Sequence, residues 1–394
     1  MTPAARTQAA IELIDAIIAA ARDQGPAADT LIVRYFAGRR YAGSKDRRAV
    51  RELVYAAVRR AGERPTSGRA AMVGLAGDDP AIAATFDGGP HAPAPITPGE
   101  PIAEPGIAPA WLVERLRAAG LDDDDMAALI DRAPLDVRVN RLKADREAMR
   151  AALPDARPLA APDGLRVPPG TNIDQLDAFR AGEIEVQDEG SQIVSMAAEA
   201  APGMAVIDLC AGAGGKSLAL ATAMDNRGEL LACDVDRSRL ARLAPRAQRA
   251  GAAIVATRLL DPGREAEALA DWRGRADVVL IDAPCSGTGT WRRNPEARWR
   301  LTPERLDRLV ATQARLLDVG AALVKPCGAL VHIVCSLLDA EGAAQADRFL
   351  ADHPGWRAEP LLLPAGRPHG AGVRLTPAHD GTDGFFVARL VRPC

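Results

Sequence analysis

From Gly203 onward, short apolar runs alternate with stretches of helical spacing, and this alternation constrains the fold more than any other feature of the sequence. Strands are predicted at residues 205–210, 229–234, 254–259, 277–282 and 329–334, with helices between them. Strands that are joined through helices form a parallel sheet with right-handed crossovers. The last apolar run, residues 385–391, has no helix after it and is predicted to pair antiparallel. Open α/β sheets bind ligands at the carboxyl ends of their strands, so a site is expected there.

Three further regions precede this alternation, and a chain of 394 residues is long enough for more than one core. Residues 1–64 show helical spacing of Ala, Ile and Leu and are predicted to be all-helical. Residues 65–108 are rich in Gly, Pro and Ala, which indicates a linker with one short helix. Residues 109–195 combine predicted helices with strands at 136–140 and 183–186, which is typical of a small α+β module. Residues 196–394 then form the α/β domain.

The charge of the chain is unevenly distributed. The formal net charge of −3 does not mark a nucleic-acid-binding protein, but residues 1–64 hold 12 Arg or Lys against 7 Asp or Glu. In the helix predicted at 44–60, with Ser44 as its N-cap, apolar residues line one face. The rest of its surface carries Arg47, Arg48, Arg51, Arg59 and Arg60. These arginines form either a solvated basic face or a face that docks RNA.

Cysteine spacing and hydropathy bear on three predictions: metal binding, membrane insertion and cellular location. The six cysteines show no CxxC or Cys/His spacing, so no metal site is predicted. The acidic run 122–125 is interpreted as the start of a helix rather than a metal site. The apolar run 11–21 is short and interrupted by acids, so neither a signal peptide nor a membrane span is predicted. The expected location is the cytoplasm, where reducing conditions keep thiols free.

The first strand of the α/β domain leads into a glycine-rich loop, DLCAGAGGKS, at residues 208–217. Glycines in such a loop let the backbone turn tightly at the start of a helix and approach a ligand. The spacing fits neither a Walker A loop nor GxGxxG. Acidic residues, Asp234 and Asp261, follow the second and third strands, where they can hydrogen-bond ribose hydroxyls. The loop and the two acids together predict an adenosyl pocket that would fit S-adenosylmethionine or NAD. The alternative is that Asp234 and Asp261 only cap the ends of their strands.

Two thiols and a carboxylate follow the next two strands. Asp282 and Cys285 come after the fourth strand, and Cys335 comes after the fifth. If these strands are neighbours, their ends lie about 4.8 Å apart, so both thiols reach one site. Each cysteine alone could instead be a packed core residue. One reaction that uses this set is methylation at carbon 5 of cytosine, which needs a thiolate to add to carbon 6, an acid for ring nitrogen 3 and a group for release.

Four motifs carry a family resemblance: DLCAGAGGKS, DAPCSGTGTWRRNPE, VCSL and DGTDGFFVARL. They resemble the motifs of the RsmB/Sun family of S-adenosylmethionine-dependent RNA cytosine-5 methyltransferases, and the resemblance covers residues 109–394. The stretches APLDVRVNRLKADREAMRAAL and VQDEGSQ are similar to the RNA-binding module of that family. The stretch GSKDRRAVRELVY resembles the NusB-like domain of some bacterial members. The loop has Gly212 and Ala213 where the family commonly has Ala-Pro, and Val334 where Thr is usual.

The resemblance implies a Rossmann-like class I methyltransferase sheet, preceded by a small α+β RNA-binding module and an N-terminal helical NusB-like domain. It makes Cys335 the nucleophile, assigns product release to Cys285 and places Asp282 at the cytosine edge. It assigns S-adenosylmethionine to Cys210, Ala211, Gly212, Ala213, Gly214, Gly215 and Lys216, with Asp234, Asp261 and Asp282. Lys216 and Asp188 would line the pocket for the target base. RNA contacts would come from Trp291, Arg292, Arg293 and Arg298, although a solvated basic loop is the alternative for each arginine.

The expected activity is methylation of carbon 5 of cytidine in RNA, with ribosomal RNA favoured over tRNA, by a monomer with no membrane partner. A tRNA cytosine-5 methyltransferase is one alternative. A non-catalytic RNA-binding or ribosome assembly factor on a methyltransferase fold is another. A DNA cytosine methyltransferase would use the thiol of the Pro-Cys pair, Cys285, as its nucleophile instead of Cys335.

Overall fold

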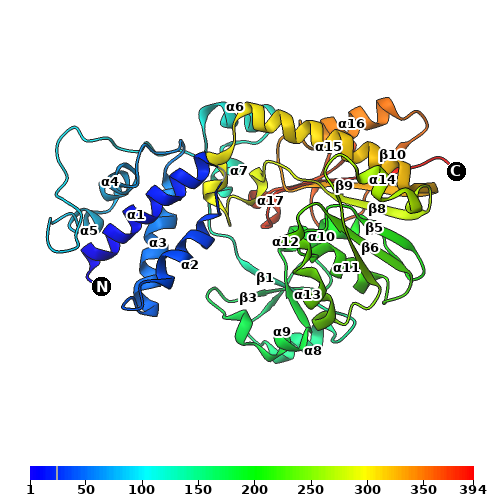
Figure 1. Ribbon diagram of the computed structural model, residues 1–394, viewed down its shortest axis with the longest axis horizontal. Helices are drawn as coiled ribbons and strands as arrows, with labels where there is room; N and C mark the ends of the chain where they lie inside the picture. Colours follow the sequence, from blue (N-terminus) through cyan, green and yellow to red (C-terminus); the bar gives the residue numbers. More distant parts are fainter. Residues whose placement is uncertain (24) are drawn as a thin grey trace. The chain divides into compact units, whose positions relative to one another are not determined.

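The computed structural model describes residues 1–23 and 25–394, which divide into two compact units (Figure 1). The first unit comprises Met1–Arg132 and Thr290–Pro303, and the second comprises Ala133–Gly289 and Glu304–Cys394. Each unit is described by itself. Within the described ranges, no helix is both long and apolar enough to cross a membrane.

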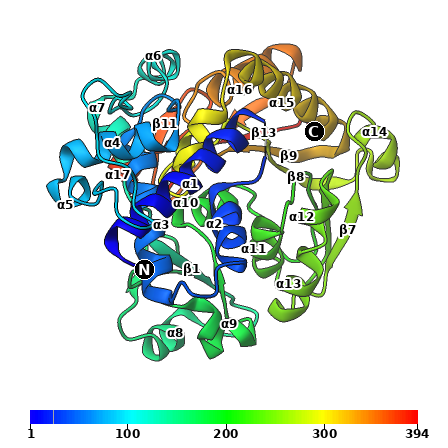
Figure 2. The ribbon, with the colours of Figure 1, turned by 60° about the vertical axis from the view of Figure 1, so that its left-hand side comes forward.

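The second unit is built on a nine-stranded sheet with the order β11-β12-β13-β9-β8-β5-β6-β7, and β10 pairs with β13 (Figures 1 and 2). The strands that form its parallel part are β5 (Ala205–Asp208), β6 (Glu229–Asp234), β7 (Val255–Leu259), β8 (Ala276–Asp282) and β9 (Val324–Val334). The antiparallel part consists of β10 (Arg357–Glu359), β11 (Arg367–His369), β12 (Gly372–Leu375) and β13 (Phe385–Val391). The predicted parallel sheet and the antiparallel last strand are therefore confirmed.

Helices cover both faces of this sheet because its strands are apolar on both sides. Alternate residues of β9 enter different cores: Val331 packs in the core under α10 (Glu189–Met196) and α11 (Gly215–Ala223), whereas Leu330 packs in the core under α15 (Pro303–Leu323). The remaining helices of the domain are α12 (Arg237–Leu240), α13 (Leu243–Ala250), α14 (Glu265–Ala268), α16 (Ala343–Asp352) and α17 (Pro377–Asp380), with short turns η2 (Ala270–Trp272) and η3 (Thr288–Thr290). This is the Rossmann-like arrangement that the sequence predicted.

A smaller antiparallel sheet with the order β2-β3-β1-β4 precedes the large one in the same unit. Its strands are β1 (Leu135–Val139), β2 (Arg157–Pro158), β3 (Gly164–Val167) and β4 (Ile184–Val186), with α8 (Arg146–Ala152), η1 (Ile173–Gln175) and α9 (Asp177–Ala181). Val137, Leu165 and Ile184 are fully buried in a separate core. The strands predicted at 136–140 and 183–186 are confirmed to within one residue at most ends.

The first unit is helical, with α1 (Pro3–Arg22), α2 (Ala28–Ala37), α3 (Ser44–Arg60), α4 (Gly68–Asp78), α5 (Pro80–Ala83), α6 (Ala110–Ala118), α7 (Asp123–Ala128) and η4 (Pro295–Arg300). The helices predicted within 1–64 are present. Gly43, not Ser44, is the N-cap of α3, and its N–H donates to Asp46 at 3.3 Å. Asp122 caps α7 as expected by accepting from the N–H of Asp125 at 2.8 Å.

The interpretation of residues 65–108 as a linker is wrong in part, because α4 belongs to the helical core. Met72 and Val73 are buried in the same cluster as Ile14 of α1. At Gly68 the helices approach so closely that an added Cβ would lie 2.1 Å from the carbonyl oxygen of Ile11. A run of Gly and Ala is a weak sequence signal for a helix, yet it permits this close helix packing. The contact division also moves the predicted domain boundary from 108/109 to 132/133.

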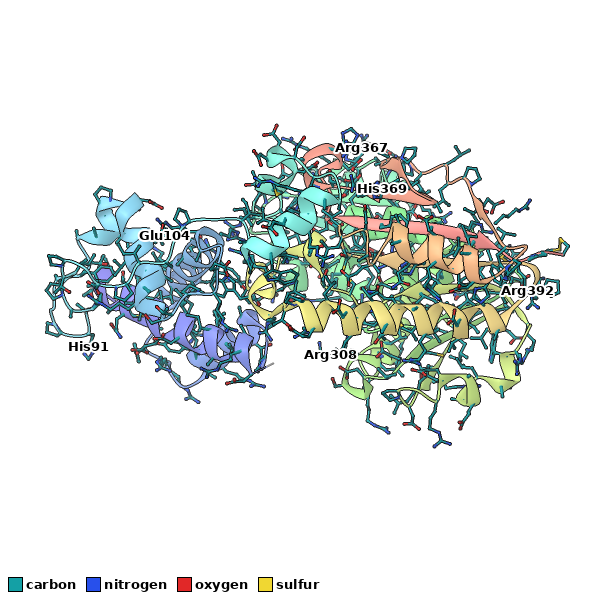
Figure 3. The ribbon with its side chains drawn as sticks, turned by 90° about the horizontal axis from the view of Figure 1, so that it is seen from above. His91, Glu104, Arg308, Arg367, His369 and Arg392 are labelled. Atoms are coloured by element: carbon teal, nitrogen blue, oxygen red, sulfur yellow. A yellow bond between two sulfur atoms is a disulfide. The ribbon has the colours of Figure 1, made fainter. Side chains whose placement is uncertain are left out.

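The structure also contains a disulfide that the cysteine spacing did not indicate. Cys327 and Cys394 are 67 residues apart in sequence and are joined beside Arg392 (Figure 3). Cys327 stands at the turn inside β9, and Cys394 follows β13, the antiparallel neighbour of β9. Cys210, Cys233, Cys285 and Cys335 remain free thiols. The expectation that all six cysteines are free is therefore wrong for this pair.

Candidate active site

The carboxyl ends of four adjacent parallel strands bring the predicted site residues to one edge of the sheet. Asp208 ends β5, Asp234 ends β6 and Asp282 ends β8. β9 lies beside β8, with Asp282 opposite Ile333, so Cys335 leaves the sheet next to the loop that carries Cys285. The neighbouring arrangement of the fourth and fifth predicted strands is thus observed.

The two thiols lie together at this edge. The Sγ atoms of Cys285 and Cys335 are 3.3 Å apart, within hydrogen-bond distance for sulfur. The hydrogen bond to Cys335, followed by burial, raises the pKa of Cys285 well above its ordinary value. The raised pKa favours the protonated thiol form of Cys285, and either sulfur can be the donor of this hydrogen bond.

A partly buried ion pair lies at the same edge of the sheet. Nζ of Lys216, on the first turn of α11, donates to Oδ2 of Asp282 at 2.8 Å. Burial opposes the ammonium charge, but the Asp282 carboxylate offsets this effect, and the pKa of Lys216 is raised. The same Nζ lies 5.5 Å from the ring centroid of Phe385 on β13. Lys216 is therefore a fixed cation beside the two thiols.

The glycine-rich loop has the geometry of a ligand cradle. Gly212 and Gly214 have φ angles of +55° and +85°, and an added Cβ at Gly214 would lie 2.0 Å from Cδ1 of Leu243. The N–H of Gly212 donates to Oδ2 of Asp234 at 2.7 Å, which fixes the loop against the end of β6. Positive φ angles favour glycine at both positions. The departure from Ala to Gly at position 212 therefore suits the conformation found here.

One carboxylate oxygen of Asp208, under this loop, lacks a hydrogen-bond partner in the described residues. Asp208 is fully buried, and its Oδ2 accepts from the hydroxyl of Ser217 at 2.6 Å. Its Oδ1 has no hydrogen-bond partner in the described part of the chain, and burial raises the pKa of Asp208 to about 7. Asp261, after β7, is exposed and available to a ligand. The glycine cradle, the unmet acceptor and the strand-end acids together fit an adenosyl group with a cationic amine.

Comparisons with known proteins agree with this geometry. The model of the 16S rRNA methyltransferase RsmB/F family matches residues 195–391. A ribosomal RNA small subunit methyltransferase B of Xylella fastidiosa is 38% identical over 293 residues, which cover 72% of this chain and 68% of the relative. The chain belongs to the RsmB/F methyltransferase family.

Other comparisons cover different shares of this RsmB/F chain. A probable ribosomal RNA small subunit methyltransferase B of Synechocystis sp. is 35% identical over 299 residues, 72% of this chain and 66% of the relative. The chain thus spans about two thirds of the length of these curated relatives. The crystal structure of PH0851 matches with a TM-score of 0.77 and 25% identity over 99% of both chains. A methyltransferase homologue from Pyrococcus horikoshii matches 72% of this chain and 99% of its own with a TM-score of 0.59 and 25% identity.

Membership of the RsmB/F family makes S-adenosylmethionine the cofactor of this chain. The residues that fit it are those of the loop Cys210–Lys216, with Asp234, Asp261 and Asp282 nearby. The NAD alternative is excluded by the family. The NusB-like assignment of the N-terminal helices stays a prediction.

Asp188 has a structural role in this RsmB/F chain in addition to the predicted one. It caps α10 by accepting from the N–H groups of Gly190 and Ser191 at 2.8 and 3.3 Å. It also accepts from the N–H of Asp383 at 3.3 Å, in the segment that leads into β13. Asp188 therefore joins α10 to the segment that carries Phe385, next to Lys216. Its place in a base pocket stays a prediction.

The predicted RNA contacts of three residues in the segment 291–298 are contradicted by burial. Trp291 and Arg298 are fully buried, and Arg292 is 6% exposed. The Nη2 group of Arg298 donates to three carbonyl oxygens, those of Val58, Arg59 and Ala61, at 2.6, 3.0 and 2.8 Å. Arg298 thus satisfies the carbonyl groups at the end of α3, as a basic residue at a helix C-terminus can. Arg293 is half-buried, and its contact with RNA stays a prediction.

Sequence reasoning missed a group of buried polar residues beneath the two thiols. Its members are Ser286, Thr288, Gln313, His332, Ser336 and Glu341. The one available signal was a polar residue within an apolar pattern, as for Gln313 on the buried face of α15 and His332 within β9. Buried polar side chains need hydrogen-bond partners, and Gln313 and His332 each have at least one, through Nε2.

Proposed function

We propose that this chain methylates carbon 5 of a cytidine in ribosomal RNA, with S-adenosylmethionine as the methyl donor and Cys335 as a covalent nucleophile. The observation that carries this proposal is the pair of thiols 3.3 Å apart beside the Lys216–Asp282 ion pair. The substrate follows from the relatives, which are named for the small-subunit ribosomal RNA. A single thiol would serve addition alone, whereas two adjacent thiols allow addition and release to be separated.

Four side chains of the site have separate roles in the proposed reaction. The Cys335 thiolate forms a bond to carbon 6, and the electron pair of the C5–C6 double bond moves into the ring as nitrogen 3 takes a proton from the carboxylic acid form of Asp282, which becomes the carboxylate. Lys216 stabilises the Asp282 carboxylate and the thiolate. When bound, S-adenosylmethionine supplies the methyl group that carbon 5 acquires. A base then takes the carbon 5 proton, the C5–C6 double bond re-forms as the bond between carbon 6 and the sulfur of Cys335 breaks, and nitrogen 3 returns its proton to Asp282. Cys285 assists this release.

The direct test is identification of the product. Incubation with 16S rRNA and S-adenosylmethionine that carries a labelled methyl group should yield labelled 5-methylcytidine in a nucleoside digest analysed by mass spectrometry. Label in tRNA but not in rRNA would favour the tRNA alternative, and label in DNA would favour the DNA enzyme. No label in any polymer, with no calorimetric signal for the cofactor, would support the non-catalytic assembly factor.

The first unit offers a basic surface that supports RNA binding, although it differs from the predicted one. Of the five arginines predicted on α3, Arg51 pairs with Asp29 at 2.8 Å and Arg60 pairs with Asp78. Arg59 is half-buried, and Nε of Arg47 donates to the carbonyl oxygen of Ala42. These four side chains are therefore partly or wholly engaged within the unit.

Exposed cations remain at the corner between α2 and α3, which we call the α2–α3 corner and define as Arg34, Arg40, Tyr41, Lys45 and Arg48. The four basic side chains have no ion-pair or hydrogen-bond partner in the described residues, and Tyr41 is 72% exposed. Cations that contact phosphates and an exposed aromatic ring that stacks on an unpaired base are the features of an RNA contact.

Reversing charge at this corner should weaken RNA binding but leave the chemical step intact. For the double variant Arg40→Glu/Lys45→Glu, we expect a higher KM for rRNA, an unchanged kcat, and a salt dependence of binding reduced by about 1 per lost phosphate contact. The double variant Arg115→Glu/Arg117→Glu, which changes two exposed arginines on α6, is the charge-matched control. An equal change in both variants would show a general charge effect and contradict the assignment.

A further inference from the structure

Beneath the two thiols, the carboxylate of Glu341 is fully buried and is surrounded by hydrogen-bond donors. Its Oε1 accepts from the backbone N–H of Ser286 at 2.8 Å and from Nε2 of Gln313 at 3.0 Å. Its Oε2 accepts from the hydroxyl of Ser336 at 2.6 Å and from the hydroxyl of Ser286. Ser286 directly follows Cys285, and Ser336 directly follows Cys335. One carboxylate therefore joins the residues next to both thiols.

Further hydrogen bonds join the same two loops. The N–H of Gly289 donates to the carbonyl oxygen of Cys335 at 3.0 Å. The hydroxyl of Thr288 accepts from the N–H of Leu337 at 2.8 Å and lies 3.1 Å from the hydroxyl of Ser336. These bonds hold the loop after β8 against the loop after β9. Glu341 is the member of this network that contacts both loops and also α15, through Gln313.

Among the described residues, Glu341 has no cationic partner. In the described ranges, no Lys, Arg or His side chain lies within ion-pair distance of its carboxylate, so neutral donors alone stabilise the charge. Nε2 of His332 hydrogen-bonds the main-chain oxygen of Glu341 at 2.9 Å, and burial lowers the pKa of His332 to about 4, so this ring is neutral. A buried carboxylate without a counter-ion is costly, and removing it leaves its donors unsatisfied.

We propose that Glu341 is a positioning residue that sets the distance between the sulfur atoms of Cys285 and Cys335. This inference rests on the proposed function, because the spacing matters only if both thiols act on the same base. The carboxylate of Glu341 hydrogen-bonds Ser286 and Ser336, the residues next to the two thiols, so its effect on the sulfur atoms passes through them. Small displacements of reacting groups lower rates strongly, so the effect should appear in kcat.

Two substitutions of Glu341 distinguish the effect of its hydrogen-bonding side chain from the effect of its negative charge. In Glu341→Ala the four donors lose their acceptor, and we expect kcat to fall by about 10²-fold while the Kd for S-adenosylmethionine stays within about threefold. In Glu341→Gln the two serine hydroxyls can rotate to accept from the new amide, so most of the activity should return. Differential scanning fluorimetry, calorimetry with the cofactor and initial rates on rRNA measure these effects.

The pH dependence of thiol alkylation gives a readout that a purely structural residue would not change. The hydrogen bond to Cys335 and burial are the main causes of the raised pKa of Cys285, and the negative charge of Glu341 adds to them. Removing that charge in Glu341→Gln should lower the pKa of Cys285, so its alkylation by iodoacetamide should begin at lower pH. Peptide mass spectrometry distinguishes Cys285 from Cys335 in this measurement.

The control is Asp277→Asn. Asp277 lies near the start of β8, the strand whose other end leads to Cys285, and its partly buried carboxylate accepts from the N–H of Ala205 at 2.7 Å. It should lower stability without changing kcat or the alkylation profile. If Glu341→Ala does not fold, Gln313→Met provides the second test, with a smaller loss of kcat and unchanged cofactor binding. Wild-type kcat in Glu341→Ala or Gln313→Met, or an alkylation profile in Glu341→Gln equal to that of the wild type, would overturn the inference. An inactive wild-type protein would instead refute the proposed function.

Discussion

Cys335→Ala is expected to lower methyl transfer to RNA by at least about 10³-fold, because no other group at this position can form the bond to carbon 6. Cys285 lies 3.3 Å away from Cys335, but its raised pKa keeps it protonated and therefore a poor nucleophile. The cofactor loop does not contact the Cys335 side chain through any hydrogen bond in the described residues. The Kd for S-adenosylmethionine should therefore stay close to the wild-type value.

Initial rates with labelled S-adenosylmethionine and calorimetry measure the two effects of Cys335→Ala. Cys394→Ser is the control, since it removes a cysteine from the disulfide with Cys327, outside the site. Its kcat should be that of the wild type. Full activity in Cys335→Ala, together with loss of activity in Cys285→Ala, would assign addition to Cys285 and favour the chemistry of the DNA enzymes.

Cys285→Ala should trap the enzyme on its substrate. Addition and methyl transfer need the thiol of Cys335. Release of the methylated base from Cys335 is the step that we assign to the second thiol, Cys285. We expect a covalent complex of protein and RNA that survives denaturation and appears as a shifted band on a denaturing gel. Turnover should fall after about one equivalent of methylated product per enzyme, which is the signature of a blocked release step.

The double variant Cys285→Ala/Cys335→Ala is the control for this trap. Its band should run with the free protein, because the bond to carbon 6 cannot form. Absence of a stable complex in Cys285→Ala, with normal turnover, would remove the release role from Cys285. A complex that persists in the double variant would show that the adduct does not involve Cys335.

Several parts of the fold follow from local sequence patterns. The strands of the α/β domain are short apolar runs that end in Asp208, Asp234 and Asp282, and these patterns are local in the chain. The glycines of the cofactor loop are equally local, since the positive φ angles of Gly212 and Gly214 favour the residue type itself. These elements could be predicted because the residues that determine them are adjacent in sequence.

Other features depend on partners that are distant in sequence. Arg298 was predicted to bind RNA as one basic residue among several, but three carbonyl oxygens near the end of α3, some 240 positions away, take up its hydrogen bonds. Glu341 has no neighbour in sequence that indicates its role, and its four donors come from two loops and α15. A charged residue carries no local sign of whether water or protein groups satisfy it.

By itself, the sequence determined where the parallel strands end, to within two residues, and which residues near those ends are chemically reactive, because hydrophobic periodicity and turn residues specify strands locally. Only the tertiary structure decided that β8 and β9 are neighbours and that the sulfur atoms of Cys285 and Cys335 meet at 3.3 Å. The pairing of strands depends on non-local hydrogen bonds, and the spacing of the two thiols depends on the network around Glu341. These cysteines are 50 positions apart in the sequence, so no local pattern could have given their distance.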